Sequence, residues 1–117
     1  MTAPHDRPTA SELVEAVGEW IRRSQVDRDI EPNAFHARVA ANMLAIVERE
    51  LALGPAQEQT HRSRLEQLGV SDDAALASAI RSGALDDRAD EVRALVWASV
   101  RDKLAVANPT YLDRVEP

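Results

Sequence analysis

The sequence contains no cysteine, and only 3% of its 117 residues are aromatic. Without cysteine the chain can form no disulfide, no thiolate metal site and no cysteine nucleophile. Its 14 basic residues are outnumbered by 20 acidic ones, which leaves a formal net charge of -6. A nucleic-acid-binding surface needs clustered positive charge, so we expect no nucleic-acid partner.

Residues that could direct the chain to a membrane are also lacking. Residues 1–8 do not contain the apolar core of a signal peptide, and no apolar run is long enough to cross a bilayer. We therefore expect a cytoplasmic protein with no membrane partner.

Apolar residues instead recur at helical spacing along most of the chain, and no segment alternates as a β-strand does. Thr9 followed by Glu12 forms a capping box that starts a first helix. Gly54 followed by Pro55 is typical of a helix end. These patterns predict helices over residues 10–26, 34–53, 55–69, 71–83 and 87–108.

The helices predict an all-α fold, an up-and-down helical bundle of about four main helices plus one short helix. We expect a single bundle domain over residues 9–108. Residues 1–8 would be a disordered or extended N-terminal segment, and residues 109–117 a C-terminal tail.

Several polar residues fall where these helices need apolar ones. At 100° per residue, His36 and Glu50 project within the apolar arc of helix 34–53, and Asn42 and Arg49 lie at its edge. Lys103 projects near the centre of the apolar side of the last helix. A buried, unpaired charge costs several kcal/mol, so Glu50 and Lys103 should be paired or face a cleft.

The topology decides which partner Glu50 meets. If helices 34–53 and 87–108 run parallel, Glu50 lies level with Lys103, whereas an antiparallel pair brings it to Arg93. We expect the parallel arrangement and a Glu50–Lys103 ion pair. In the simplest interpretation this pair is structural, and a backbone carbonyl or a group near Asp90 satisfies His36.

The alternative is a polar pocket in the bundle core that binds an anionic or hydroxylated small molecule. Its candidate ligand-binding residues are His36, Asn42, Arg49, Glu50 and Lys103. No glycine-rich phosphate loop, nucleophile elbow or metal-binding spacing of histidines occurs in the sequence. We therefore predict no catalytic residue, no cofactor and no metal site.

A group of motifs resembles a known family of small all-helical bacterial proteins of unknown function. It comprises Asp6-Arg7-Pro8-Thr9-Ala10, Glu12-Leu13, the runs from Phe35 to Asn42 and from Ile46 to Leu51, Leu53-Gly54, Lys103-Leu104, and Asn108 to Leu112. Members of that family occur alone or joined to aminoglycoside-phosphotransferase-like kinases. The resemblance implies a partner rather than a chemistry.

From these observations we expect a non-catalytic accessory or interaction module that partners a phosphotransferase-like kinase. The other expected partner is a second copy of the chain, which would give a homodimer. An apolar stripe with Leu65 and Leu68, or the first helix with Trp20, would form the contact surface. The competing hypothesis is the small-molecule-binding protein or enzyme with the polar pocket.

Overall fold

The computed structural model of the chain describes residues 3–115, in which all regular elements are helical. In order they are α1 (Ala10–Ile21), η1 (Arg22–Val26), α2 (Ala34–Gln67), α3 (Asp73–Ser82), η2 (Asp86–Arg88), α4 (Ala89–Ala107) and α5 (Pro109–Val115). The predicted all-α class and helical bundle are confirmed.

Helix α1 begins at the predicted capping box. The Thr9 hydroxyl accepts a hydrogen bond from the Glu12 backbone N–H at 3.1 Å, and the Glu12 carboxylate accepts one from the Thr9 N–H at 2.9 Å. Two orphan N–H groups of the first turn are therefore satisfied by local side chains. The chain continues from α1 into η1, a single π-helical segment, so the helical region matches the predicted range 10–26.

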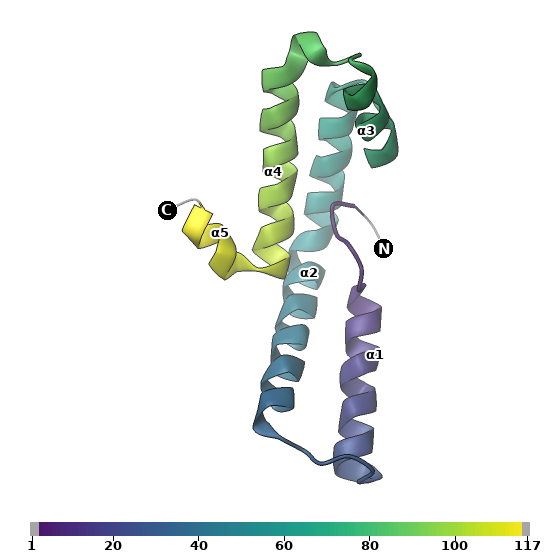
Figure 1. Ribbon diagram of the computed structural model, residues 1–117, viewed down its shortest axis with the longest axis vertical. Coiled ribbons are helices and arrows are strands. Elements are labelled where there is room, and N and C mark those ends of the chain that lie inside the picture. The colour runs from purple at the N-terminus through teal and green to yellow at the C-terminus, as the bar shows by residue number, and fades with distance from the viewer. Residues whose placement is uncertain (1–2, 116–117) are drawn as a thin grey trace.

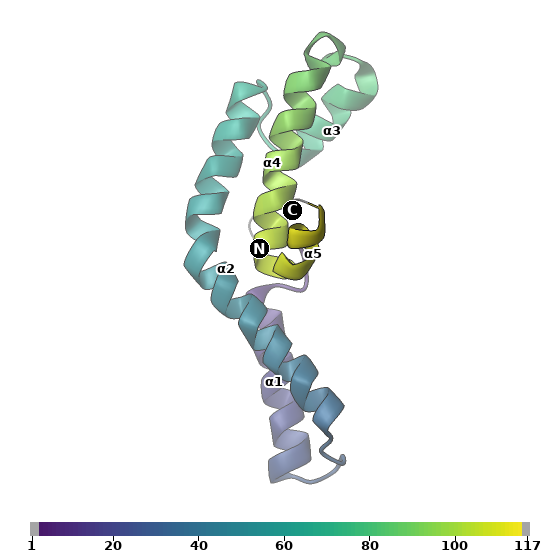
Figure 2. The ribbon, with the colours of Figure 1, turned by 90° about the vertical axis from the view of Figure 1, so that its left-hand side faces the viewer.

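Helix α2 is one continuous helix of 34 residues, so the predicted break at Gly54 and Pro55 is wrong. A proline inside a helix removes one hydrogen bond, here the one to the Leu51 carbonyl, and costs about 3 kcal/mol. Packing against α1 on the first half and α4 on the second offsets this cost. The helix bends near its middle instead of ending (Figure 2).

Gly69 terminates α2, whose last helical residue is Gln67, close to the helix end that the sequence predicts. Gly69 has a φ of +76°, its N–H donates to the Glu66 carbonyl, and the Val70 N–H donates to the Leu65 carbonyl. This is a Schellman motif, in which glycine takes the left-handed conformation at no steric cost. Gly83 ends α3 in the same way.

The segment predicted as a C-terminal tail contains α5. The Asn108 side chain accepts a hydrogen bond from the Tyr111 N–H at 3.1 Å, and its backbone carbonyl accepts one from the Leu112 N–H. Proline at position 109 fits the first turn of a helix, where its missing N–H is not needed. The two residues that end α4 thus also start α5.

The bundle is elongated, and its long axis follows α2 (Figure 1). Helix α1 packs antiparallel to the first half of α2, and α4 packs antiparallel to the second half. The molecule measures 59 × 30 × 24 Å. It therefore consists of two helical hairpins that share one long helix.

We expect acidic pH to destabilise the first turn of α1, because the partners of Glu12 stabilise its ionised carboxylate. Hydrogen bonds from Arg7 and from the Thr9 backbone lower the pKa of Glu12 to about 2. A carboxyl whose pKa is lower in the folded state stabilises the protein above its unfolded pKa, near 4.5, and loses that contribution as the pH falls towards 2. Glu12→Gln should therefore have a lower urea midpoint than the wild type at pH 6, and the two midpoints should converge near pH 2. The same titration of a variant at the exposed Glu15, Glu15→Gln, is the control, and a constant gap for Glu12→Gln would contradict the prediction.

Candidate functional site

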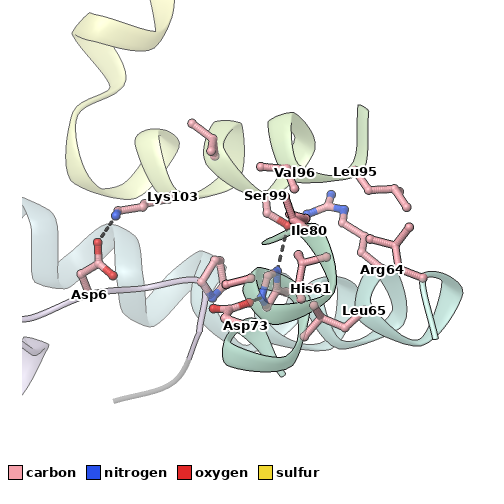
Figure 3. A pocket seen from close by; sticks show the side chains of 15 residues that line it. Asp6, His61, Arg64, Leu65, Asp73, Ile80, Leu95, Val96, Ser99 and Lys103 are labelled. Carbon is pink, nitrogen blue, oxygen red and sulfur yellow. Dashed lines mark hydrogen bonds and ion pairs between the residues drawn. The ribbon is translucent and has the colours of Figure 1, made fainter. Parts of the chain in front are cut away.

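A cavity of about 330 Å³ lies between the second half of α2, helix α3 and helix α4 (Figure 3). Helix α3 makes few close backbone contacts with either neighbour, so side chains rather than backbone surround the space. The apolar wall consists of Pro4, Leu65, Leu68, Leu76, Ala77, Ile80, Leu95, Val96 and Val100. The polar lining consists of Asp6, His61, Arg64, Asp73, Ser99 and Lys103.

His61 is the centre of the polar part. It is only 8% exposed, its Nδ1 lies 2.8 Å from the Ser99 hydroxyl, and its Nε2 lies 2.7 Å from a carboxylate oxygen of Asp73. Because a carboxylate only accepts, Nε2 carries a proton and donates to Asp73. In the neutral imidazole Nδ1 then accepts from the Ser99 hydroxyl. His61 thereby joins α2 to both α3 and α4.

Arg64, one helical turn after His61, completes the network. Its Nη1 donates to the Ser99 hydroxyl at 3.0 Å and to a carboxylate oxygen of Asp102 at 2.8 Å. The Arg64 and Asp102 side chains are 17% and 28% exposed, so the ion pair is partly buried. Such a pair is less screened by solvent than a surface pair.

The N-terminal segment passes beside the cavity and contributes Pro4 and Asp6. Asp6 forms an ion pair with Lys103, which Figure 3 shows at the edge of the cavity. Both side chains remain partly exposed to solvent. This ion pair therefore fixes residues of the N-terminal segment to α4.

The structure does not bring the five predicted ligand-binding residues together. His36 and Asn42 are exposed on the first half of α2, where the His36 Nδ1 lies 2.8 Å from the Asn33 side-chain nitrogen. The Arg49 Nε donates to the Val106 carbonyl at 2.8 Å. Glu50 lines a separate hollow beside the start of α1, and only Lys103 lines the cavity.

The predicted Glu50–Lys103 ion pair is wrong, because Lys103 pairs with Asp6 and Glu50 lines the other hollow. The predicted parallel arrangement is wrong as well, because α2 and α4 run antiparallel. Arg49 lies level with Val106, and Gln57 bonds to the Asp102 carbonyl at 3.0 Å. The antiparallel alternative, Glu50 with Arg93, is wrong as well. Arg93 lies at the other end of α4 and pairs with Asp90. Because α2 continues well past Gly54, Glu50 lies beside the C-terminal end of α4 and far from Arg93.

Of the residues in this network, only Lys103 is predicted from the sequence. A pattern that could have found them is the spacing of His61, Arg64, Leu65 and Leu68, which places two polar and two apolar residues on one face of a helix. The sequence contains no corresponding pattern for Asp6 or Asp73, which reach the site from other segments.

The order Asp73–His61–Ser99 is the order of groups in a serine hydrolase, but the surroundings differ. Hydrolysis also needs N–H groups that stabilise the oxyanion. Ser99 lies inside α4, where the backbone N–H groups bond to carbonyls four residues earlier. The arrangement can therefore recognise polar groups, and it lacks a backbone oxyanion hole.

A second feature is an apolar stripe, which we call the α2 seam, formed by Phe35, Ile46 and Leu53. Phe35 and Leu53 are 63% and 41% exposed, and Ile46 is half-buried. At 100° per residue these three lie within about 40° of the side on which Arg49, Gln57 and Arg64 meet α4. Helix α4 ends at Ala107, level with Arg49, and α5 turns away from α2 (Figure 1). The face that α4 covers in the second half of α2 is thus open around Phe35 and Ile46, and Leu53 continues this stripe beside the end of α4 while staying partly exposed.

The contact stripe expected from Leu65 and Leu68 is wrong. These side chains are 5% and 3% exposed and belong to the core. They pack between α2, α3 and α4, because α3 folds back onto the end of α2.

The family described as Domain of unknown function (DUF6285) matches residues 28–111. The match includes the α2 seam and most residues of the cavity, and it leaves out α1. No curated protein and no solved structure matches the chain. Among residues 3–115, no helix is long and apolar enough to span a membrane, and no group of three or more His, Asp or Glu side chains is arranged to hold a metal ion.

Proposed function

The chain belongs to the DUF6285 family of domains of unknown function, and from its surface we propose that it is an interaction module that binds a partner protein through the α2 seam. The observation that carries the proposal is the amount of surface that the folded chain leaves exposed. A cytoplasmic location is part of the proposal, and the lack of cysteine in the sequence agrees with it.

The exposed surface is too large for a self-sufficient protein of this size. A compact monomer of 12.9 kDa exposes about 6,300 Å², whereas this chain exposes 7858 Å². Its radius of gyration is 18.2 Å, against about 13 Å for a compact chain of this length. The excess exceeds the roughly 800 Å² that each partner buries in a standard interface.

The α2 seam is the part of this surface best suited to receive a helix. Phe35 and Leu53 lie 18 residues apart on the same side of α2, so the stripe between them is about 27 Å long. The side chains of Asn42 and Arg49 add hydrogen-bonding groups to its edge. An aromatic anchor with aliphatic neighbours and a polar rim is the usual composition of an interface.

A phosphotransferase-like kinase is the proposed partner, because the motifs of the sequence resemble those of proteins found joined to such kinases. The motifs from Phe35 to Asn42, from Ile46 to Leu51 and at Leu53-Gly54 contain the three residues of the seam. A second copy of the chain is the other candidate partner, and the exposed Phe35 and Leu53 favour it equally.

The substitution Phe35→Glu is expected to weaken binding at least tenfold, because it replaces the aromatic anchor of an apolar contact with a charge. Co-elution with the kinase and light scattering of the isolated chain at micromolar concentration measure the two partners separately. Leu44→Glu is the matched control, since Leu44 is 46% exposed on the same helix but lies half a turn from Phe35. A wild-type chain that stays monomeric and does not bind the kinase would refute the proposal, as would equal weakening by the control.

A further inference from the structure

The basic and acidic groups on the lining of the cavity between α2, α3 and α4 already have partners, and this pairing decides which ligand the cavity suits. Each basic group on its lining has an acidic partner: Arg64 bonds to Asp102, His61 to Asp73, and Lys103 to Asp6. An anionic ligand would have to displace a carboxylate or lie beside it. A cationic ligand would meet Arg64 and Lys103. The cost of burying an uncompensated charge therefore disfavours both.

The same lining still offers hydrogen bonds. A guanidinium has five N–H donors, and the bonds of Arg64 to other residues of the described chain use only its Nη1. The N–H groups on Nε and Nη2 can donate to a ligand. Asp73 uses one carboxylate oxygen for His61, and its other oxygen can accept a hydrogen bond.

The remaining wall of the cavity is aliphatic. Leu65 and Leu68 from α2, Leu76 and Ile80 from α3, and Val96 from α4 contribute to it. A volume of about 330 Å³ is at the lower end of the range for small-molecule sites. The ligand must therefore place an apolar chain against this wall while its polar end meets Arg64 and Asp73.

We propose that the cavity binds a neutral medium-chain aliphatic amide, whose carbonyl accepts from Arg64 and whose amide N–H donates to Asp73. Ser99 and His61 hold these two residues in place, because Ser99 accepts from Arg64 and His61 donates to Asp73. The site shares no residue with the α2 seam. Ligand binding in the cavity can therefore be tested independently of partner binding by the α2 seam.

The test compares three ligands with the same alkyl chain in calorimetric titrations of the full chain: octanamide, octanoate and octylammonium. Octanamide is expected to bind at least tenfold more tightly than either charged ligand. Tighter binding of octanoate or octylammonium would overturn the proposal, and so would the absence of binding by all three.

Two variants link the binding to this cavity. Ser99→Ala removes the acceptor that orients Arg64 and should weaken octanamide binding at least tenfold, whereas Ser63→Ala, at an exposed serine of α2, should not. Ile80→Trp fills the cavity from α3 and should abolish binding. Ile80 is 47% exposed, so this larger side chain leaves the core intact and keeps the test valid if Ser99→Ala fails to fold. Unchanged binding by Ile80→Trp would place the ligand elsewhere and refute the proposal.

Discussion

Leu68→Ala is expected to lower the free energy of unfolding by about 3 kcal/mol, the largest stability effect that we predict for a single residue. Leu68 is 3% exposed, and it belongs to a core of only seven buried hydrophobic residues in the part of the chain described. It also packs where α2 ends, α3 folds back and α4 passes. Truncation would enlarge the cavity that Leu68 already lines.

Urea unfolding followed by circular dichroism measures this effect. Leu51→Ala makes the same chemical change in the same helix, but at a side chain that is 71% exposed. It should alter the free energy of unfolding by less than about 0.5 kcal/mol. Equal losses in the two variants would mean that Leu68 is not part of a packed core.

Arg64→Met is expected to cost about 2 kcal/mol, because hydrogen bonds to charged groups contribute roughly that much. The substitution keeps the apolar stem and removes the donor to Ser99 and Asp102. Asp102 is 28% exposed, so it would be left partly buried without its cation. This loss of a partner costs more than the net value of the pair.

A double-mutant cycle with Asp102→Asn isolates the ion pair from the other contacts of Arg64. The single variants should each be destabilised, and the double variant should be more stable than the sum of the two losses predicts. Arg62→Met is the control, because Arg62 lies two residues away on an exposed part of α2. Additive losses would show that Arg64 and Asp102 do not interact energetically.

Local patterns predicted the helix starts well, since capping depends on neighbouring residues alone. The capping box of Thr9 and Glu12 is confirmed, and so is the helix end at Gly69, which also depends on neighbouring residues. The predicted break at Pro55 failed because the cost of one proline can be offset by tertiary packing on both sides of it. That packing is not visible in the local sequence.

The candidate site depended on topology, which helical spacing does not determine. Spacing at 100° per residue places His36 and Glu50 in the apolar arc of helix 34–53. These residues would be buried only if other helices packed along the whole length of that helix. Helix α4 ends level with Arg49, so His36 lies beyond its reach. His61 and Ser99 contact each other across 38 residues of sequence. Such a contact could not be placed without knowing that α2 continues to Gln67.

Because two hairpins share α2, each half of that helix is packed by a different partner helix, and the two halves can unfold separately. Helix α1 packs on the first half of α2, and α4 packs on the second half, with no comparable packing between α1 and α4. Separation of α1 from α2 would leave the contacts of His61, Arg64 and Ser99 in place. Cooperative units with few shared contacts open independently. The N-terminal hairpin can therefore unfold and refold while the other hairpin stays native, so the unfolding of this small chain need not be all-or-none.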